Sequence, residues 1–262
     1  MAGTATRVDV WIMLEYRRAW QAKAIETNTF DALTQRWLAQ TVTDFADRGL
    51  IARPQFIRRP ERSDGIHLFV AHNGQLNGTQ VADEKSLQQL DLVDSPLPEA
   101  HGPQYFVCTN AKRDLCCAKF GRPTYAAIHR ALPDRVWQTT HVGGHRYAPN
   151  ILELPSANLY GRVFANDVPE FLAITERKET AWRFLRGNCA LTQVAQTAQQ
   201  VLAEQYGSLS LLQETEDSAT FATSDGVRRV SVKPDENGLD LMPSCGKETK
   251  RVYPLRGTIE KS

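Results

Sequence analysis

The chain has 262 residues, 42% of them hydrophobic, and a net charge of +1 from 31 Lys and Arg against 30 Asp and Glu. This length and composition are typical of a globular protein and exclude disordered and fibrous classes. No run approaches the ~18 consecutive apolar residues of a membrane span, and no basic excess indicates nucleic-acid binding. The first residues show no secretory pattern, so we expect a cytoplasmic protein with neither a membrane nor a nucleic acid as partner.

The first hundred residues predict a small α/β unit. An apolar run at 8–14 indicates a buried strand, and apolar residues at helical spacing from Phe30 to Phe45 indicate an amphipathic helix. Further strands are predicted at 55–58 and 66–71. Strand, helix, strand, strand is the order of a thioredoxin-like sandwich, although it also fits other α/β folds.

A stretch with three prolines at 95–103 predicts a linker to a second α/β unit. The elements expected in that unit are strands at 104–107, 136–140 and 151–154, a hairpin at 159–163, and helices at 123–132, 168–177 and 191–206. The tail predicts a hairpin around 224–226 and short strands at 239–242 and 251–255. We therefore expect an N-terminal half at 1–98, a second half at 99–207 and a β-rich extension at 208–262.

Cysteine and histidine cluster in the second half. Three of the five cysteines, Cys108, Cys116 and Cys117, lie in one segment, and His141 and His145 follow about two dozen residues later. Each group follows a predicted strand, so both can lie at one edge of a sheet, on the loops where functional groups concentrate. In a reducing compartment, clustered cysteines indicate metal or redox chemistry rather than a disulfide framework.

The donor types favour zinc, copper or an iron–sulfur cluster over magnesium or calcium. The spacing of His141 and His145 fits a zinc site, but Cys108 and Cys117 lie nine positions apart, wider than zinc-finger pairs. The wide gap suits a larger centre that spans two irons. Two alternatives stay open: a zinc-binding structural or interaction module with the same ligands, and a thiol–disulfide enzyme that uses Cys116 and Cys117, although C-x-x-C is absent.

The segment 106–121 resembles the cysteine loop of the sucrase/ferredoxin-like family, whose members have a thioredoxin-like ferredoxin fold. Four more stretches resemble later elements of that family: 141–150, 154–155, 160–163 and 186–188. The resemblance is strong over about 104–205 and weaker over 8–100. It implies a thioredoxin-like ferredoxin fold. Together with the elements predicted along the chain, we expect an α/β protein of two thioredoxin-like halves with a small C-terminal α+β extension.

The resemblance also implies a [2Fe–2S] cluster. In the bis-histidinyl branch of the family, the matching positions bind it, so the implied ligands are Cys108, Cys117, His141 and His145. Two cysteines would hold one iron and two histidines the other, and Cys116, one register off, should point elsewhere. The implied function is electron transfer. No carboxylate pair supports glycosidase chemistry, and no catalytic residue is assigned.

Several residues around the motif have weaker expectations. Asp114 is expected to hold the cysteine loop by a local side-chain bond, and Cys189 and Cys245 are expected to be structural. Basic residues flank the motif and could dock an acidic redox partner, offset cluster charge, or form an ordinary solvated rim. They are Lys112, Arg113, Lys119, Arg122 and Arg146.

Overall fold

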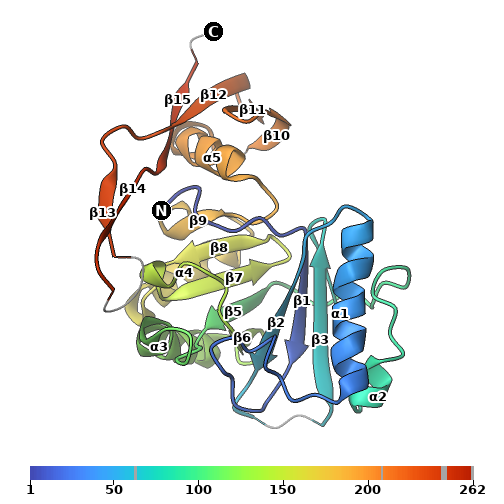
Figure 1. The fold of residues 1–262 in the computed structure, drawn as a ribbon. Helices are drawn as coiled ribbons and strands as arrows, with labels where there is room; N and C mark the ends of the chain where they lie inside the picture. Colours follow the sequence, from blue (N-terminus) through green and yellow to red (C-terminus); the bar gives the residue numbers. More distant parts are fainter. Residues whose placement is uncertain (62–63, 208, 243–246, 261–262) are drawn as a thin grey trace.

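The computed structural model describes residues 1–61, 64–207, 209–242 and 247–260, and a nine-stranded mixed sheet forms its centre (Figure 1). The strands lie in the order β4-β3-β1-β2-β6-β5-β7-β8-β9. Their bounds are β1 (Val10–Glu15), β2 (Ala52–Arg58), β3 (Ile66–His72), β4 (Gln75–Val81), β5 (Gln104–Cys108), β6 (Val136–Thr139), β7 (Asn150–Leu154), β8 (Asn158–Gly161) and β9 (Leu185–Asn188). The helices are α1 (Ala32–Asp47), α2 (Glu84–Leu87), α3 (Leu115–Ala131), α4 (Val168–Thr175) and α5 (Gln193–Tyr206), with 3₁₀ turns η1 (His145–Tyr147), η2 (Ala165–Asp167) and η3 (Trp182–Phe184).

The sheet contains the same topology twice. In the first copy, β1 and β2 are parallel and flank α1 in the chain, β3 is antiparallel to β1, and β4 is antiparallel to β3. In the second copy, β5, α3, β6, β7 and β8 repeat this pattern. The copies join where β2 and β6 pair antiparallel, at Ile57 with Thr139 and Arg58 with Gln138. The predicted α/β, thioredoxin-like fold is confirmed.

One face of this sheet carries a core that both copies share. Phe69 of β3 contacts Trp137 of β6, with ring centroids 5.6 Å apart, and Phe106 of β5, at 6.1 Å. These strands are not neighbours in the sheet order, so the sheet must curl to bring them together. The shared core also contains Cys108 and Cys117, which are therefore buried among residues of both copies.

Helix α1 begins and ends at residues that the sequence marks clearly. The Asp31 side chain accepts hydrogen bonds of 2.8 Å from the backbone N–H groups of Leu33 and Thr34, an N-cap. Gly49, with a φ of +75°, follows its end. Leu38 and Phe45 are buried against the first copy of the sheet, as the predicted apolar face required.

Helix α3 begins eight residues earlier than the sequence indicates. The sequence predicts a helix from about Pro123 to Leu132, and the predicted start is wrong. The helix begins at Leu115, capped by Asp114, and Pro123 lies inside it. Pro123 is on the exposed side, where the carbonyl that loses its partner can face water. Cys116 and Cys117 are therefore in the first helical turn, and the loop covers 109–114 only.

The C-terminal part forms a separate layer (Figure 1). Helix α5 is capped by Thr192 and packs against a four-stranded sheet in the order β10-β11-β12-β15. The strands of this part are β10 (Ser210–Glu214), β11 (Ser218–Thr223), β12 (Gly226–Pro234), β13 (Leu239–Leu241), β14 (Lys250–Val252) and β15 (Leu255–Ile259). The sequence groups α5 with the second half, but its apolar side packs on the tail sheet. None of the described helices combines the length and apolar character that a membrane crossing requires.

A buried carboxylate on β1 gives the fold a pH dependence. Burial tends to raise the pKa of Glu15, but hydrogen bonds from His67 and Arg17 more than offset this, and its pKa falls to about 2. Glu15 Oε2 lies 2.8 Å from His67 Nδ1, and Oε1 lies 2.6 Å from Arg17 Nε. A carboxylate with a lowered folded-state pKa stabilises the fold above its unfolded pKa of about 4.3. That stabilisation is lost as the pH falls from about 4.5 toward 2.

We expect Glu15→Gln to lower the free energy of unfolding by about 1–3 kcal/mol at pH 7, because buried donors lose a charged acceptor. The difference from the parent protein should shrink by pH 3. Urea unfolding at both pH values measures this. The matched control is Glu26→Gln, at the exposed 2.9 Å pair with Lys23, where little should change at either pH. Equal stability of the Glu15 variant and its parent at pH 7 would contradict the prediction.

Candidate metal centre

Two thiols and one imidazole meet where parallel strands β5 and β6 end. Cys108 is the last residue of β5 and pairs in register with Thr139, the last residue of β6, so the chain after β6 passes directly beside Cys108. Cys117 comes from the first turn of α3, which packs over β5. The sequence predicts that the cysteine and histidine motifs lie at one edge of the sheet. Cys108 and His141 do lie together there.

The three ligand atoms are close enough to share one metal centre. His141 Nδ1 lies 3.9 Å from Cys108 Sγ and 3.7 Å from Cys117 Sγ, and all three atoms lie within 4.8 Å of one another. Both cysteines are fully buried and His141 is half-buried. The imidazole is thus the part of the group nearest to solvent.

His145, the fourth residue of the expected set, lies beside this group but is not a member of it. Its ring is stacked on that of His141, with centroids 5.3 Å apart, and its Nε2 lies 3.9 Å from Asp114 Oδ2. Its Nδ1 is buried and has no hydrogen-bond partner among the described residues. A buried nitrogen without a partner is costly, and a metal ligand role would satisfy it.

The other cysteines take different positions. Cys116 is half-buried and disulfide-bonded. Cys117 is a free thiol, so the two adjacent cysteines are not joined to each other. Cys189 is a free, fully buried thiol in the shared core, whereas Cys245 lies outside the described residues. The expected local bond of Asp114 is present, since its Oδ1 accepts from Cys116 N at 2.8 Å.

The hydrogen bond between the two buried thiols shifts their pKa values in opposite directions. The pKa of Cys108 lies well below its usual range because Cys117 donates a hydrogen bond to it, an effect that burial opposes and that nearby His141 supports. The pKa of Cys117 is raised by the same hydrogen bond and by burial. A metal binds thiolates rather than thiols, and the lowered pKa of Cys108 is in the direction that metal binding requires. Soft thiolate and borderline imidazole donors fit zinc or an iron–sulfur centre.

The histidine side of the group opens on a hollow of about 360 Å³. It is lined by the 22–26 loop and by Arg53, Asn110, Arg113 and His141, among others. Asn110 donates to the carbonyl of Gln21 at 3.0 Å, which ties the cysteine loop to this part of the first copy. The first copy thus covers the buried thiols and leaves one imidazole accessible.

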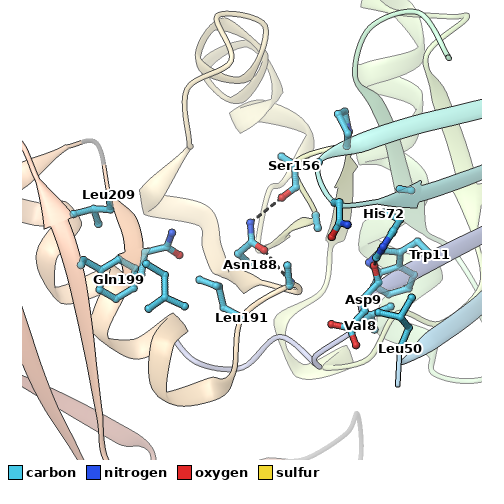
Figure 2. A pocket seen from close by; sticks show the side chains of 18 residues that line it. Val8, Asp9, Trp11, Leu50, His72, Ser156, Asn188, Leu191, Gln199 and Leu209 are labelled. Carbon is cyan, nitrogen blue, oxygen red and sulfur yellow. Dashed lines mark hydrogen bonds between the residues drawn. The ribbon is translucent and has the colours of Figure 1, made fainter. Parts of the chain in front are cut away.

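A second hollow, of about 450 Å³, lies between the central sheet and the C-terminal layer (Figure 2). Its titratable lining groups are Asp9 and His72, and His72 Nδ1 lies 3.0 Å from the Asp9 carbonyl oxygen. Two of its lining residues are joined by a hydrogen bond, which Asn188 donates to the carbonyl of Ser156 at 2.7 Å (Figure 2). None of the cysteine or histidine residues of the expected ligand set lines it, so it is separate from the candidate centre.

Sequence reasoning did not foresee that arginines approach the histidine loop. Arg186 of β9 is 2% exposed and donates to the carbonyl of Gly143 at 3.0 Å. Arg53 of β2 donates to the carbonyl of His141 at 3.2 Å. The one signal in the sequence was the resemblance of 186–188 to a family element, which gave Arg186 no role. The basic residues that were singled out, including Arg113 and Arg146, are instead exposed.

Comparison with known proteins identifies the family. Residues 1–187 match the model of the Sucrase/ferredoxin-like family. The chain belongs to this family. The resemblance inferred from the cysteine and histidine motifs is thereby confirmed, and it extends to the first residue.

Two solved structures are similar to part of this Sucrase/ferredoxin-like chain. One is a thioredoxin-like [2Fe–2S] ferredoxin from Aquifex aeolicus, 18% identical, with a TM-score of 0.29, covering 33% of this chain and 91% of that one. The other is a cysteine-to-serine variant of the Aquifex aeolicus ferredoxin, also 18% identical with a TM-score of 0.29, covering 32% and 97%. No curated protein matches this chain.

Proposed function

We propose that this Sucrase/ferredoxin-like protein is an electron-transfer protein that holds one [2Fe–2S] cluster on Cys108, Cys117, His141 and His145. The observation that carries the proposal is the convergence of two buried thiols and His141. The ring of His145 is stacked on that of His141, and its buried Nδ1 has no hydrogen-bond partner among the described residues. Cys108 and Cys117 would hold one iron, and the two histidines the other. Such a cluster accepts and donates one electron.

The chain's own residues prepare this site for that chemistry. Cys108 and Cys117 would both bind the cluster as thiolates, without their protons. Two thiolates in place of four leave the bound cluster two charges less negative, which eases reduction. We expect a reduction potential higher than that of all-cysteine plant-type ferredoxins, which is about −400 mV. It should lie closer to the range of Rieske centres, about −150 to +300 mV.

The accessible side of the site suggests how electrons leave it. His141 faces the hollow, while the cysteines are buried. The exposed basic residues near the motif suit an acidic redox partner, which we place in the cytoplasm. These residues are Lys112, Arg113, Lys119, Arg122 and Arg146.

One observation favours a second candidate, a zinc site. The atoms of Cys108, Cys117 and His141 lie within 4.8 Å of one another, which suits a single ion as well as a cluster. In that case His145 or a water would complete a tetrahedral site, and the protein would be a structural or interaction module without redox activity.

Anaerobic purification followed by iron, acid-labile sulfide and zinc analysis decides between the two. The cluster predicts red-brown protein with two irons and two sulfides per chain and an EPR signal after reduction with dithionite. Colourless protein with stoichiometric zinc, which still takes up no iron after reconstitution with iron and sulfide, would overturn the proposal and favour zinc.

A further inference from the structure

Two arginines that have no acidic partner among the described residues lie against the loop that carries the candidate histidine ligands. Arg186 is almost fully buried and Arg53 is half-buried. The ion pairs found within the described part of the chain involve other arginines. A buried guanidinium without a carboxylate is unusual, because the desolvation of the charge is then offset by hydrogen bonds alone.

Arg186 fixes the glycine turn between the two histidines. Its Nη1 donates to the Gly143 carbonyl at 3.0 Å and to Asn150 Oδ1 at 2.9 Å, while Asn150 Nδ2 donates to the Gly144 carbonyl at 3.1 Å. The guanidinium fills the space beside Gly144 so closely that a Cβ there would lie 2.2 Å from its Nη2. The other side of Arg186 is held by the Thr4 carbonyl, at 2.7 Å from Nη2. The turn conformation therefore depends on this side chain.

Arg53 approaches the same loop from the other copy of the fold. Its Nη2 donates to the His141 carbonyl at 3.2 Å, its guanidinium carbon lies 5.5 Å from the centre of the Trp11 ring, and it lines the hollow beside the His141 ring. Each half of the sheet thus supplies one arginine to a backbone carbonyl of the histidine loop.

Burial lowers the pKa of Arg53, and that of Arg186 to about 10, while the buried cysteines Cys189 and, to a smaller extent, Cys108 act in the opposite direction on both. Both guanidinium groups are thus within electrostatic reach of Cys108, a candidate ligand, as well as of Cys189. A cation in a poorly solvated site favours the redox state of its neighbour that carries more negative charge.

We propose that Arg53 and Arg186 are positioning residues that hold the His141–His145 loop by its carbonyls, and that their charges favour the reduced state of the cluster. This inference rests on the proposed [2Fe–2S] function. Neither arginine has a carboxylate partner within the described chain. Their positive charges would therefore balance the additional negative charge of the reduced cluster.

The test is the reduction potential of purified, cluster-loaded variants, determined by EPR-monitored redox titration. Arg53→Gln and Arg186→Gln should each shift the equilibrium toward the oxidised state on the order of tenfold, from the Coulomb interaction of one unit charge at an effective dielectric constant near 20. For one electron, a tenfold shift corresponds to about 59 mV. Arg53→Lys, which keeps the charge, should restore most of the potential.

Arg59→Gln is the matched control. Arg59 also donates to a backbone carbonyl, that of Val136 at 3.1 Å, and lies over the Trp137 ring at 3.8 Å, but it does not contact the histidine loop. The reduction potential of the Arg59→Gln variant should equal that of the parent protein.

Iron and sulfide are measured in every sample before its titration, which separates the two proposals. A parent protein without iron and sulfide would overturn the proposed function, and this inference with it. If the parent is loaded, Arg53→Gln with full iron and an unchanged potential would overturn the arginine inference alone. The two Arg53 variants decide the matter even where Arg186→Gln fails to fold, because Arg53 is half-buried and makes fewer contacts.

Discussion

Cys117→Ala is expected to abolish cluster binding. Cys117 Sγ is one of three donor atoms within 4.8 Å of one another, and its side chain is fully buried, so no water can readily replace it. Loss of residues that merely support metal ligands typically costs 10–100-fold in affinity, and loss of a thiolate ligand should exceed about 100-fold. Iron and sulfide per chain after anaerobic reconstitution measure this.

Cys189→Ala is the matched control, because Cys189 is also a free, fully buried thiol in the same shared core. Its variant should retain the iron and sulfide of the parent. If Cys189→Ala lost the cluster as completely as Cys117→Ala, general disruption of the core rather than ligand loss would explain both results.

The histidine variants test the fourth ligand. Under the four-ligand cluster proposal, His141→Ala and His145→Ala should both lose iron, although the structure groups only His141 with the thiols among the described residues. Retention of a full cluster by His145→Ala would remove His145 from the ligand set and leave its buried Nδ1 without that explanation. His129→Ala, at a histidine that pairs with Glu61, is the control and should keep its iron.

The sequence predicts the site better than the sheet around it, because the site depends mainly on local signals. Cys108 ends an apolar run and His141 follows another, which predicts that both lie at the edge of a sheet. Cys117 is predicted in a loop, since a helix that opens at Pro123 would begin after it. Asp114 is recognisable as a local hydrogen-bond acceptor, but its role as the N-cap of α3 depends on a helix that begins before the proline.

Two of the strands that sequence reasoning missed, β4 and β9, lack an apolar pattern. β4 reads Gln-Leu-Asn-Gly-Thr-Gln-Val, and of its residues only Leu76 is buried, because the strand lies at the edge of the sheet. β9 contains the buried Arg186, which hydropathy assigns to the surface. The pairing of β2 with β6 joins segments about 80 residues apart, and such long-range contacts leave no periodic signal in one sequence. The arginines at the histidine loop were missed for the same reason.

Gly121→Ala is expected to destabilise the protein by roughly 3 kcal/mol, at the upper end of the usual range for overpacking. Gly121 lies in α3 where the helix meets β5, and a Cβ at this position would lie 2.1 Å from the Cys108 carbonyl oxygen. The atom in the way belongs to the backbone of a buried strand and cannot rotate aside. In an open helix, Gly→Ala would instead stabilise by about 0.5–1 kcal/mol, so the sign of the change identifies the contact. Urea unfolding of the metal-free protein measures it.

The neighbouring Arg122 is the control position, because it is exposed on the same helix. Arg122→Ala should leave the free energy of unfolding nearly unchanged. A Gly121→Ala variant as stable as the parent would show that α3 can move away from β5 at little cost.

The Gly121 contact should also link stability to the metal centre. To relieve the clash, either α3 or Cys108 must shift, and Cys117 belongs to that helix while Cys108 is the residue being displaced. The separation of the two thiols therefore changes in either case, and iron content should fall together with stability. Glu15→Gln destabilises the sheet at a carboxylate bonded to His67 and Arg17, and it should lower stability without lowering iron content. If loss of stability alone lowered the iron content, both variants would lose iron. Displacement of the two cysteine ligands by α3 explains why only Gly121→Ala should do so.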